Sequence, residues 1–178
     1  SMRAPGAGLA ILIAGGAFNT ADGQPVDGVA QWDGVSWSGL GLGSPGAGFW
    51  VNGLAVFDAD GPGPMNADLY VGGNFTTAGG GSAEGIAKWD GANWSALATG
   101  LAGAGSSTVE VFSMQVFDDD GPGPNNPALF VGGAFSKAGI INTGGFAKWN
   151  GSAWSVPAGS PVPGLSVHGL LSLDSSAA

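Results

Sequence analysis

The sequence has no cysteine and very few basic residues, and these absences exclude several classes of function. Without cysteine there is no disulfide framework, no thiol chemistry and no thiolate metal site. Four lysine and arginine residues stand against thirteen acidic ones, and the formal net charge is −9. Because so few cations could not neutralise a run of phosphates, we expect no nucleic-acid partner. No stretch of about 18 apolar residues occurs either, so we expect no membrane-spanning helix.

Groups suited to catalysis are also scarce. His168 is the only histidine, and no acidic or nucleophilic residue stands at motif spacing from it. No serine lies in a Gly-x-Ser-x-Gly turn. The glycine-rich residues 79–82 lack the following lysine of a phosphate-binding loop. We therefore expect no enzyme activity and no cofactor, and we interpret His168 as a channel-lining side chain rather than a base or a ligand.

Glycine is abundant instead, with 36 residues, and hydrophobic residues still make up 44% of the chain. A chain this apolar is not typical of disorder. Glycine-rich turns alternate with short aromatic and β-branched runs, a pattern that predicts an all-β fold. No stretch of about a dozen residues is free of glycine and proline and also carries a helical apolar stripe, so we expect no helix.

Three patterns recur along the chain, each three times. A run ending in Gly-Gly-x-Phe occurs at residues 12–18, 69–75 and 129–135. A Trp-Asp-Gly or Trp-Asn-Gly turn followed by a second tryptophan occurs at 32–37, 89–94 and 149–154. An apolar run ending in aspartate occurs at 51–58, 111–118 and, more loosely, 167–174. The Asp-Gly and Asn-Gly turns suit tight hairpins, and the Gly-Gly pairs suit a bulge or the close approach of another backbone.

The order of these patterns predicts a β-propeller, because four short antiparallel strands per repeat are typical of a propeller blade. With the strands of a blade lettered a to d, the chain contains b-c-d, a-b-c-d, a-b-c-d and a final a. We expect one domain over residues 1–178. Its blade units span about 9–44, 49–104 and 109–160, and a closing strand spans 166–174.

These motifs resemble kelch-like propeller blades, the type found in the central domain of galactose oxidase. They are more similar to a repeat of secreted or surface-associated bacterial proteins, Leu-Tyr-Val-Gly-Gly-x-Phe followed by Ala-Lys-Trp-Asp-Gly-x-x-Trp. The resemblance covers Leu9 to Asp174 and implies a propeller fold and a secreted or surface-associated parent protein. The turns between strands a and b are longer than in kelch blades. The copper and radical-cofactor residues of galactose oxidase have no counterparts, so its activity is not implied.

The strand count predicts self-assembly. Three blades are too few for a ring, since propellers have about 4 to 8. An open half would expose apolar faces and unpaired strand edges. We predict a two-fold homodimer with six blades, in which the closing strand of each chain completes the b-c-d sheet of the other. The predicted interface residues are Val167, Leu170, Leu173, Leu12 and Ile13. A trimer with nine blades fits less well, and a monomeric fragment of a longer propeller is the remaining alternative.

Two functions are open at this point. One is a self-assembling scaffold or interaction module without catalytic activity. The other is a propeller that binds a carbohydrate, a protein or a cation at its channel mouth, or that is the remnant of an enzyme. The candidate calcium ligands are carboxylates at alternate positions before a glycine, Asp58, Asp60, Asp118 and Asp120. Prolines stand at Pro62 and Pro122, where a third ligand would be expected. We therefore favour polar turns over a calcium site, and the scaffold over the binding protein.

The remaining distinctive side chains are interpreted from their place in the repeat. The paired tryptophans recur at a constant position, which favours packing between blades over a carbohydrate-binding surface. Trp50 has no aromatic counterpart, since Glu110 stands at the same position in the next copy. Trp50 is thus the candidate for a contact at the surface or channel mouth, although local packing is the favoured role. Lys88 and Lys148 are expected to be solvated.

Overall fold

The computed structural model describes residues 11–41, 50–61, 67–103, 108–121, 123, 125–160 and 166–172. All regular secondary structure within these ranges is β-strand, as the sequence predicted. None of the described residues belongs to a helix that is long and apolar enough to cross a membrane.

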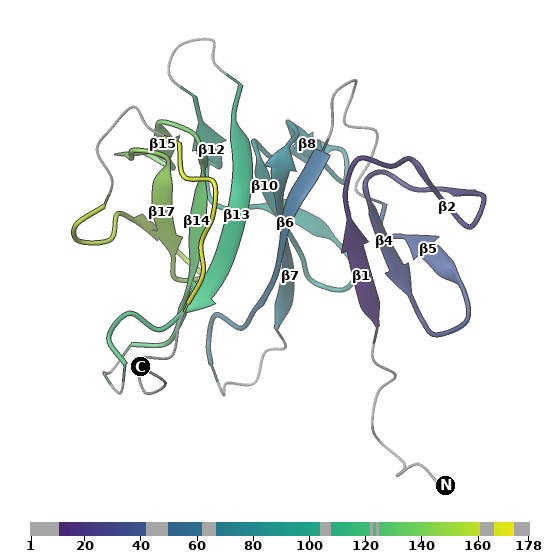
Figure 1. Cartoon of the computed structure of the whole chain (residues 1–178), viewed down its shortest axis with the longest axis horizontal. Helices are drawn as coiled ribbons and strands as arrows, with labels where there is room; N and C mark the ends of the chain where they lie inside the picture. The colour runs from purple at the N-terminus through teal and green to yellow at the C-terminus, as the bar shows by residue number, and fades with distance from the viewer. Residues whose placement is uncertain are drawn as a thin grey trace, which may run out of the picture.

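Three antiparallel sheets, here called units 1 to 3, follow one another along the chain and from right to left in Figure 1. Unit 1 has the strand order β1 (Leu12–Gly15), β4 (Val29–Trp32) and β5 (Trp37–Gly39). Unit 2 has the order β6 (Trp50–Phe57), β7 (Asp68–Asn74), β10 (Ile86–Trp89) and β11 (Trp94–Ala96). Unit 3 has the order β13 (Glu110–Phe117), β14 (Ala128–Ala134), β17 (Phe146–Trp149) and β18 (Trp154–Ser155). The expected order a-b-c-d is therefore present in units 2 and 3, and unit 1 contains b-c-d.

Short strands extend the hairpins that join strand b to strand c in each unit. They are β2 (Thr20–Ala21) with β3 (Gln24–Pro25), β8 (Thr77–Ala78) with β9 (Gly81–Ser82), and β15 (Lys137–Ala138) with β16 (Ile141–Asn142). The further strand β12 (Leu101–Ala102), which follows unit 2, pairs with β15 of unit 3. Units 2 and 3 are thus joined by main-chain pairing at this hairpin as well as by side-chain packing.

The tight turns between the last two strands form at the predicted positions. In unit 2, Oδ1 of Asp90 accepts hydrogen bonds from the backbone N–H groups of Ala92 and Asn93, at 2.8 and 2.7 Å. Asp33 and Asn150 accept the equivalent pairs of bonds in units 1 and 3. The glycine after each capping residue has a φ near +97°, as at Gly91 (+96°), where L side chains are strained. The turn chemistry thus follows from the Asp-Gly or Asn-Gly dipeptide.

The Gly-Gly pairs produce both of the features that the sequence predicted for them. The pairing of β6 with β7 shifts register between Val51 and Gly53, which is a bulge. At the same place a Cβ built on Gly73 would lie 1.9 Å from the carbonyl oxygen of Trp50. No side chain fits there, because the obstructing atom belongs to the backbone of the neighbouring strand.

The apolar core lies between successive units. One cluster between units 1 and 2 contains Val29, Leu69 and Val71, with Ile13 packed against it. A second cluster between units 2 and 3 contains Tyr70 and both tryptophans of unit 3. Because side chains alternate along a strand, Leu69 and Val71 face unit 1 whereas Tyr70 faces unit 3. Unit 2 is therefore apolar on both faces and packs against unit 1 on one side and unit 3 on the other.

Candidate assembly surfaces at the two ends of the chain

The tail segment, residues 166–172, lies on unit 3 as β6 lies on unit 1 and as β13 lies on unit 2. In each case a valine covers the first glycine of the Gly-Gly pair. A Cβ built on that glycine would lie 2.5, 2.6 and 2.7 Å from the valine Cγ1 in the pairs Gly15–Val51, Gly72–Val111 and Gly132–Val167. The N–H of Val167 donates to the Gly133 carbonyl at 3.3 Å, as that of Val51 donates to Gly16 at 3.4 Å. The tail thus occupies the first-strand position of a further unit.

The tail is held on β13 by polar contacts as well. The backbone N–H of Leu170 donates to Oγ of Ser113 at 3.0 Å, and Nε2 of Gln115 donates to Oγ of Ser172 at 3.3 Å. No strand is assigned within the tail, and none of the described strands pairs with it. The expected closing strand over 166–174 is therefore not formed within residues 166–172, where the segment lies on unit 3 without a hydrogen-bonded ladder on its outer edge, and its pairing with a second copy stays a prediction. Asp174, its expected end, lies outside the described residues.

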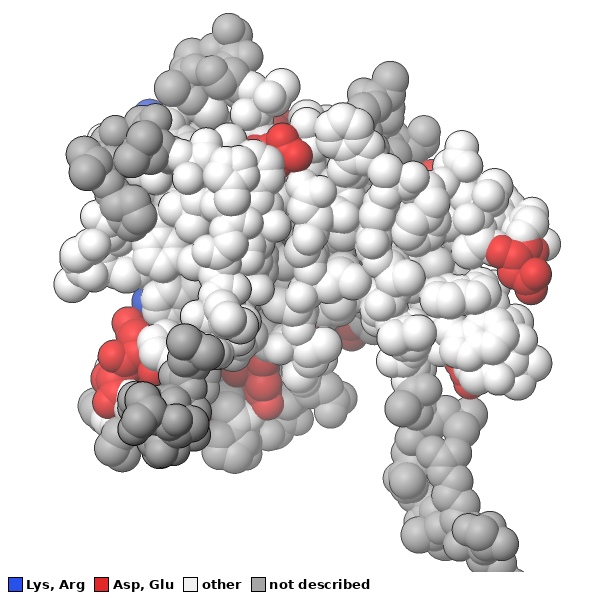
Figure 2. Space-filling model, viewed as in Figure 1, with Lys and Arg blue, Asp and Glu red and all other residues white. Residues whose placement is uncertain are grey.

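The strands β1, β6 and β13 and the tail lie side by side on the face viewed in Figure 1. Figure 2 shows that this face is mostly uncharged, with acidic side chains mainly near its margins. The residue after the recurring valine contacts the neighbouring strand in the row, from β6 to β13 and from β13 to the tail. Nδ2 of Asn52 donates to the Val111 carbonyl at 3.0 Å, and the ring of Phe112 stacks on His168 at 4.3 Å. His168 is exposed in this row and contacts an aromatic ring, and its expected place in a channel stays a prediction.

The opposite end of the chain is unit 1, whose β1 has no first strand beside it in the described structure. Its Leu12 is 60% exposed, whereas the equivalent leucines of the later units, Leu69 and Leu129, are 9% and 0% exposed. Ile13 points the other way and is half-buried against unit 2. Of the predicted interface residues, Leu12 therefore faces outward, while Val167 and Leu170 are half-buried against unit 3. Leu173 lies outside the described residues.

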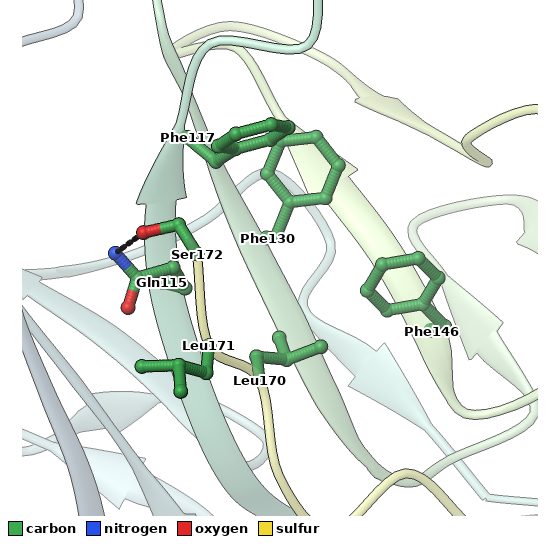
Figure 3. Close-up of a pocket in the computed structure, with 7 residues that line it drawn as sticks. All are labelled: Gln115, Phe117, Phe130, Phe146, Leu170, Leu171 and Ser172. Carbon is green, nitrogen blue, oxygen red and sulfur yellow. Dashed lines mark hydrogen bonds between the residues drawn. The ribbon is translucent and has the colours of Figure 1, made fainter. Parts of the chain in front are cut away.

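An apolar pocket of about 280 Å³ opens on the outer face of unit 3, where a following unit would lie (Figure 3). It is lined by Gln115, Phe117, Phe130, Phe146, Leu170, Leu171 and Ser172. The three phenylalanines come from β13, β14 and β17, and the other wall is formed by the tail and Gln115. The sequence alone did not reveal this pocket, although its aromatic residues stand at repeat positions.

The second tryptophan of each turn motif makes a contact that the sequence analysis did not foresee. Nε1 of Trp94 donates to the Leu40 carbonyl of unit 1 at 2.8 Å, and Nε1 of Trp154 donates to the Leu97 carbonyl of unit 2 at 3.2 Å. The equivalent Trp37 has no hydrogen-bond partner for its indole among the described residues. The constant spacing of the second tryptophan in the repeat could have indicated these hydrogen bonds, because a buried indole N–H usually finds an acceptor.

The candidate calcium ligands lie in two separate turns after β6 and β13. In the second turn Asp118 accepts the backbone N–H of Asp120 at 3.3 Å, and Asp120 accepts Nδ2 of Asn125 at 2.7 Å. Although partial desolvation opposes it, bonding to Asn125 keeps the pKa of Asp120 below its usual value. In the first turn the pKa of Asp58 is raised, mainly by a hydrogen bond with Asp60 and to a smaller extent by desolvation. The described residues contain no group of three or more side chains placed to hold a metal ion.

Lys88 and Lys148 are not simply solvated, and that expectation was wrong. Nζ of Lys88 lies 2.7 Å from Oδ2 of Asp68, and this hydrogen bond raises the pKa of the lysine. Lys148 pairs with Asp119 and lies 5.7 Å from the centre of the Phe130 ring. The two aspartates reach the lysines of the third strands by different routes. Asp68 is the first residue of β7, which pairs with β10, whereas Asp119 lies in the turn that follows β13. Trp50 is 47% exposed, so its candidacy for a surface contact stays a prediction.

Searches against protein-family models, curated proteins and solved structures found no match to this chain. The resemblance to kelch-like blades therefore stays a prediction, and function is inferred from the contacts of the chain itself.

Proposed function

We propose that this protein is a self-assembling β-propeller scaffold without catalytic activity, in which two copies close a ring of six blades. Each unit would be one blade. The observation that carries the proposal is the contact of Val167 with Gly132. It repeats the contacts that Val51 and Val111 make with the equivalent glycines of the preceding units. Among the described residues, the tail would supply a first strand with no blade beyond it, and unit 1 would be a blade with no first strand.

The register of the exchange follows from the two complete units. In unit 2, Val51 lies opposite Gly73 and Ala55 lies opposite Tyr70. Transferred to the equivalent positions, this register places Val167 opposite Gly16 of the partner copy and Leu171 opposite its Ile13. The tail would then form an antiparallel ladder on β1, which would remove both unpaired edges.

Exposed apolar side chains at the two ends support closure with a second copy. Leu171 is 81% exposed on the tail, and Val56 is 67% exposed on β6. The equivalent positions inside the chain, Gln115 and Ser172, are hydrogen-bonded to each other. The ring would bring Leu171 of one copy against Val56 of the other, which buries two apolar groups that the single chain leaves in water. A two-fold ring forms this interface twice with the same surfaces.

The roles of the polar side chains favour a scaffold over a ligand-binding propeller. Asp90 caps a turn, Asp120 is held by Asn125, and Lys88 is paired with Asp68. Each of these groups is engaged by a neighbour within its own unit. Polar groups used in this way stabilise each blade and do not converge on a common point.

The test of the proposed function is the mass of the protein in dilute solution, measured by light scattering after size-exclusion chromatography. We expect twice the chain mass of 17.3 kDa, unchanged over a wide range of concentration. A compact, well-folded particle of one chain mass would contradict the proposal. Three times the chain mass would contradict closure by two copies.

A further inference from the structure

We propose that the apolar pocket on unit 3 is the socket for Leu12 of a second copy, an inference that rests on the proposed function. The same interface exists once inside the chain, between units 2 and 3. There the residues equivalent to Phe117, Phe130 and Phe146 are Phe57, Tyr70 and Ile86 of unit 2. All three belong to the buried cluster that also contains Leu129, the leucine equivalent to Leu12.

The phenylalanine of the pocket and the leucine that contacts it are each buried where a neighbouring unit is present and exposed where it is absent. Phe57 is 2% exposed beside unit 3, whereas the equivalent Phe117, with no unit beyond it, is 43% exposed. Leu129 is fully buried against unit 2, whereas Leu12 is mostly exposed. The chain therefore has an uncovered apolar pocket at one end and an uncovered leucine at the other, at the two positions that meet inside the chain.

The tryptophans of unit 1 fit the same arrangement. Trp149 and Trp154 of unit 3 are in contact at 5.1 Å between ring centroids and are buried in the cluster around Leu129. Trp32 and Trp37 form the equivalent pair beside Leu12, at 5.5 Å, and both are only partly buried. The face of unit 1 that carries Leu12 thus presents the same aromatic flank that closes the internal interface.

The test compares two lysine substitutions in the full chain, Leu12→Lys and Ile140→Lys. Ile140 is 92% exposed in the turn between β15 and β16, does not line the pocket, and serves as the matched control. The dissociation constant of the dimer is measured by sedimentation velocity on dilution. We expect Leu12→Lys to weaken the dimer by about 100-fold or more, because each ring loses two buried leucines and gains two buried charges. Ile140→Lys should change it by less than about 3-fold.

A second substitution on the socket side keeps the inference testable if Leu12→Lys acts indirectly. Phe117→Asp is also at an exposed position, so the single chain should still fold. If Lys at position 12 enters the pocket beside Asp at position 117, the double variant should dimerise at least about 10-fold more tightly than the product of the single effects predicts. Strictly multiplicative effects would overturn the socket.

The outcomes separate the two proposals. A monomeric wild-type chain would overturn the proposed function and the socket with it. A dimeric wild type whose dissociation constant responds equally to Leu12→Lys and Ile140→Lys would overturn the socket alone.

Discussion

Gly16 of unit 1 and Gly73 of unit 2 occupy the same position in two sheets, but their surroundings differ. A Cβ on Gly73 would lie 1.9 Å from the Trp50 carbonyl oxygen, because β6 passes directly over it. A Cβ on Gly16 would meet, among the described residues, only the ring of Phe18 at 3.2 Å. The glycine is required in unit 2 by a strand that is present. In unit 1 none of the described strands lies over the glycine.

The largest effect should come from Gly73→Ala. The new methyl group would overlap a backbone carbonyl of β6, and neither strand can move without breaking the ladder. We expect a loss of about 3 kcal/mol or more in the free energy of unfolding, measured by urea denaturation. A stable Gly73→Ala variant would show that β6 does not approach β7 as described.

Gly16→Ala is the matched test at the open edge. Since only a flexible side chain lies near the new methyl group, the unfolding free energy of the single chain should change by less than about 1 kcal/mol. The partner's tail would meet the methyl group as β6 meets Gly73, so the dimer should be lost in sedimentation. If Gly16→Ala leaves the dimer intact, the tail does not pair with β1.

The indole hydrogen bonds offer a smaller contrast of the same kind. Trp94→Phe removes the bond to the Leu40 carbonyl and should lower the unfolding free energy by about 1 kcal/mol. Trp37→Phe removes an N–H that has no acceptor among the described residues, so the stability of the single chain should not change. In the proposed ring, the acceptor for Trp37 would be the carbonyl of Pro157 in the partner copy, because Pro157 is equivalent to Leu40. The dimer of the Trp37→Phe variant should then weaken by about 3-fold to 10-fold per interface. Equal loss of chain stability in both variants would contradict this distinction.

The smallest effect concerns Asp58 and depends on pH. Because the pKa of Asp58 is raised in the folded chain, the folded state holds the proton more tightly than the unfolded state. Stability therefore falls as the pH rises from the ordinary value of 3.8 through the folded pKa. Asp58→Asn should melt at a higher temperature than wild type at neutral pH, with the difference lost by about pH 3. An Asp58→Asn variant that melts at the wild-type temperature at both pH values would contradict this assignment.

The sequence was sufficient for much of the fold because its signals are local and repeated. The turns capped by Asp33, Asp90 and Asn150 form where the dipeptides predict them, and the Gly-Gly pairs mark the bulges. The ion pair of Lys88 with Asp68 was missed because it depends on where β7 begins and on its register with β10, which composition does not determine. The pocket was missed for a similar reason. It is the uncovered side of an interface, and its shape depends on how Phe117 and the tail lie against β14.

The most direct test of strand exchange is a disulfide between the two positions that the register places opposite each other in different copies. The chain has no cysteine, so Ile13→Cys with Leu171→Cys introduces the only thiols. After mild oxidation, denaturing electrophoresis without reductant should show a covalent species of twice the chain mass, since directly opposite residues in a ladder lie within disulfide reach. The control pair Ile13→Cys with Leu170→Cys, shifted by one residue to the opposite face of the strand, should cross-link poorly. Single chains after oxidation of the first pair, or equal cross-linking of both pairs, would contradict the exchange of the tail between copies.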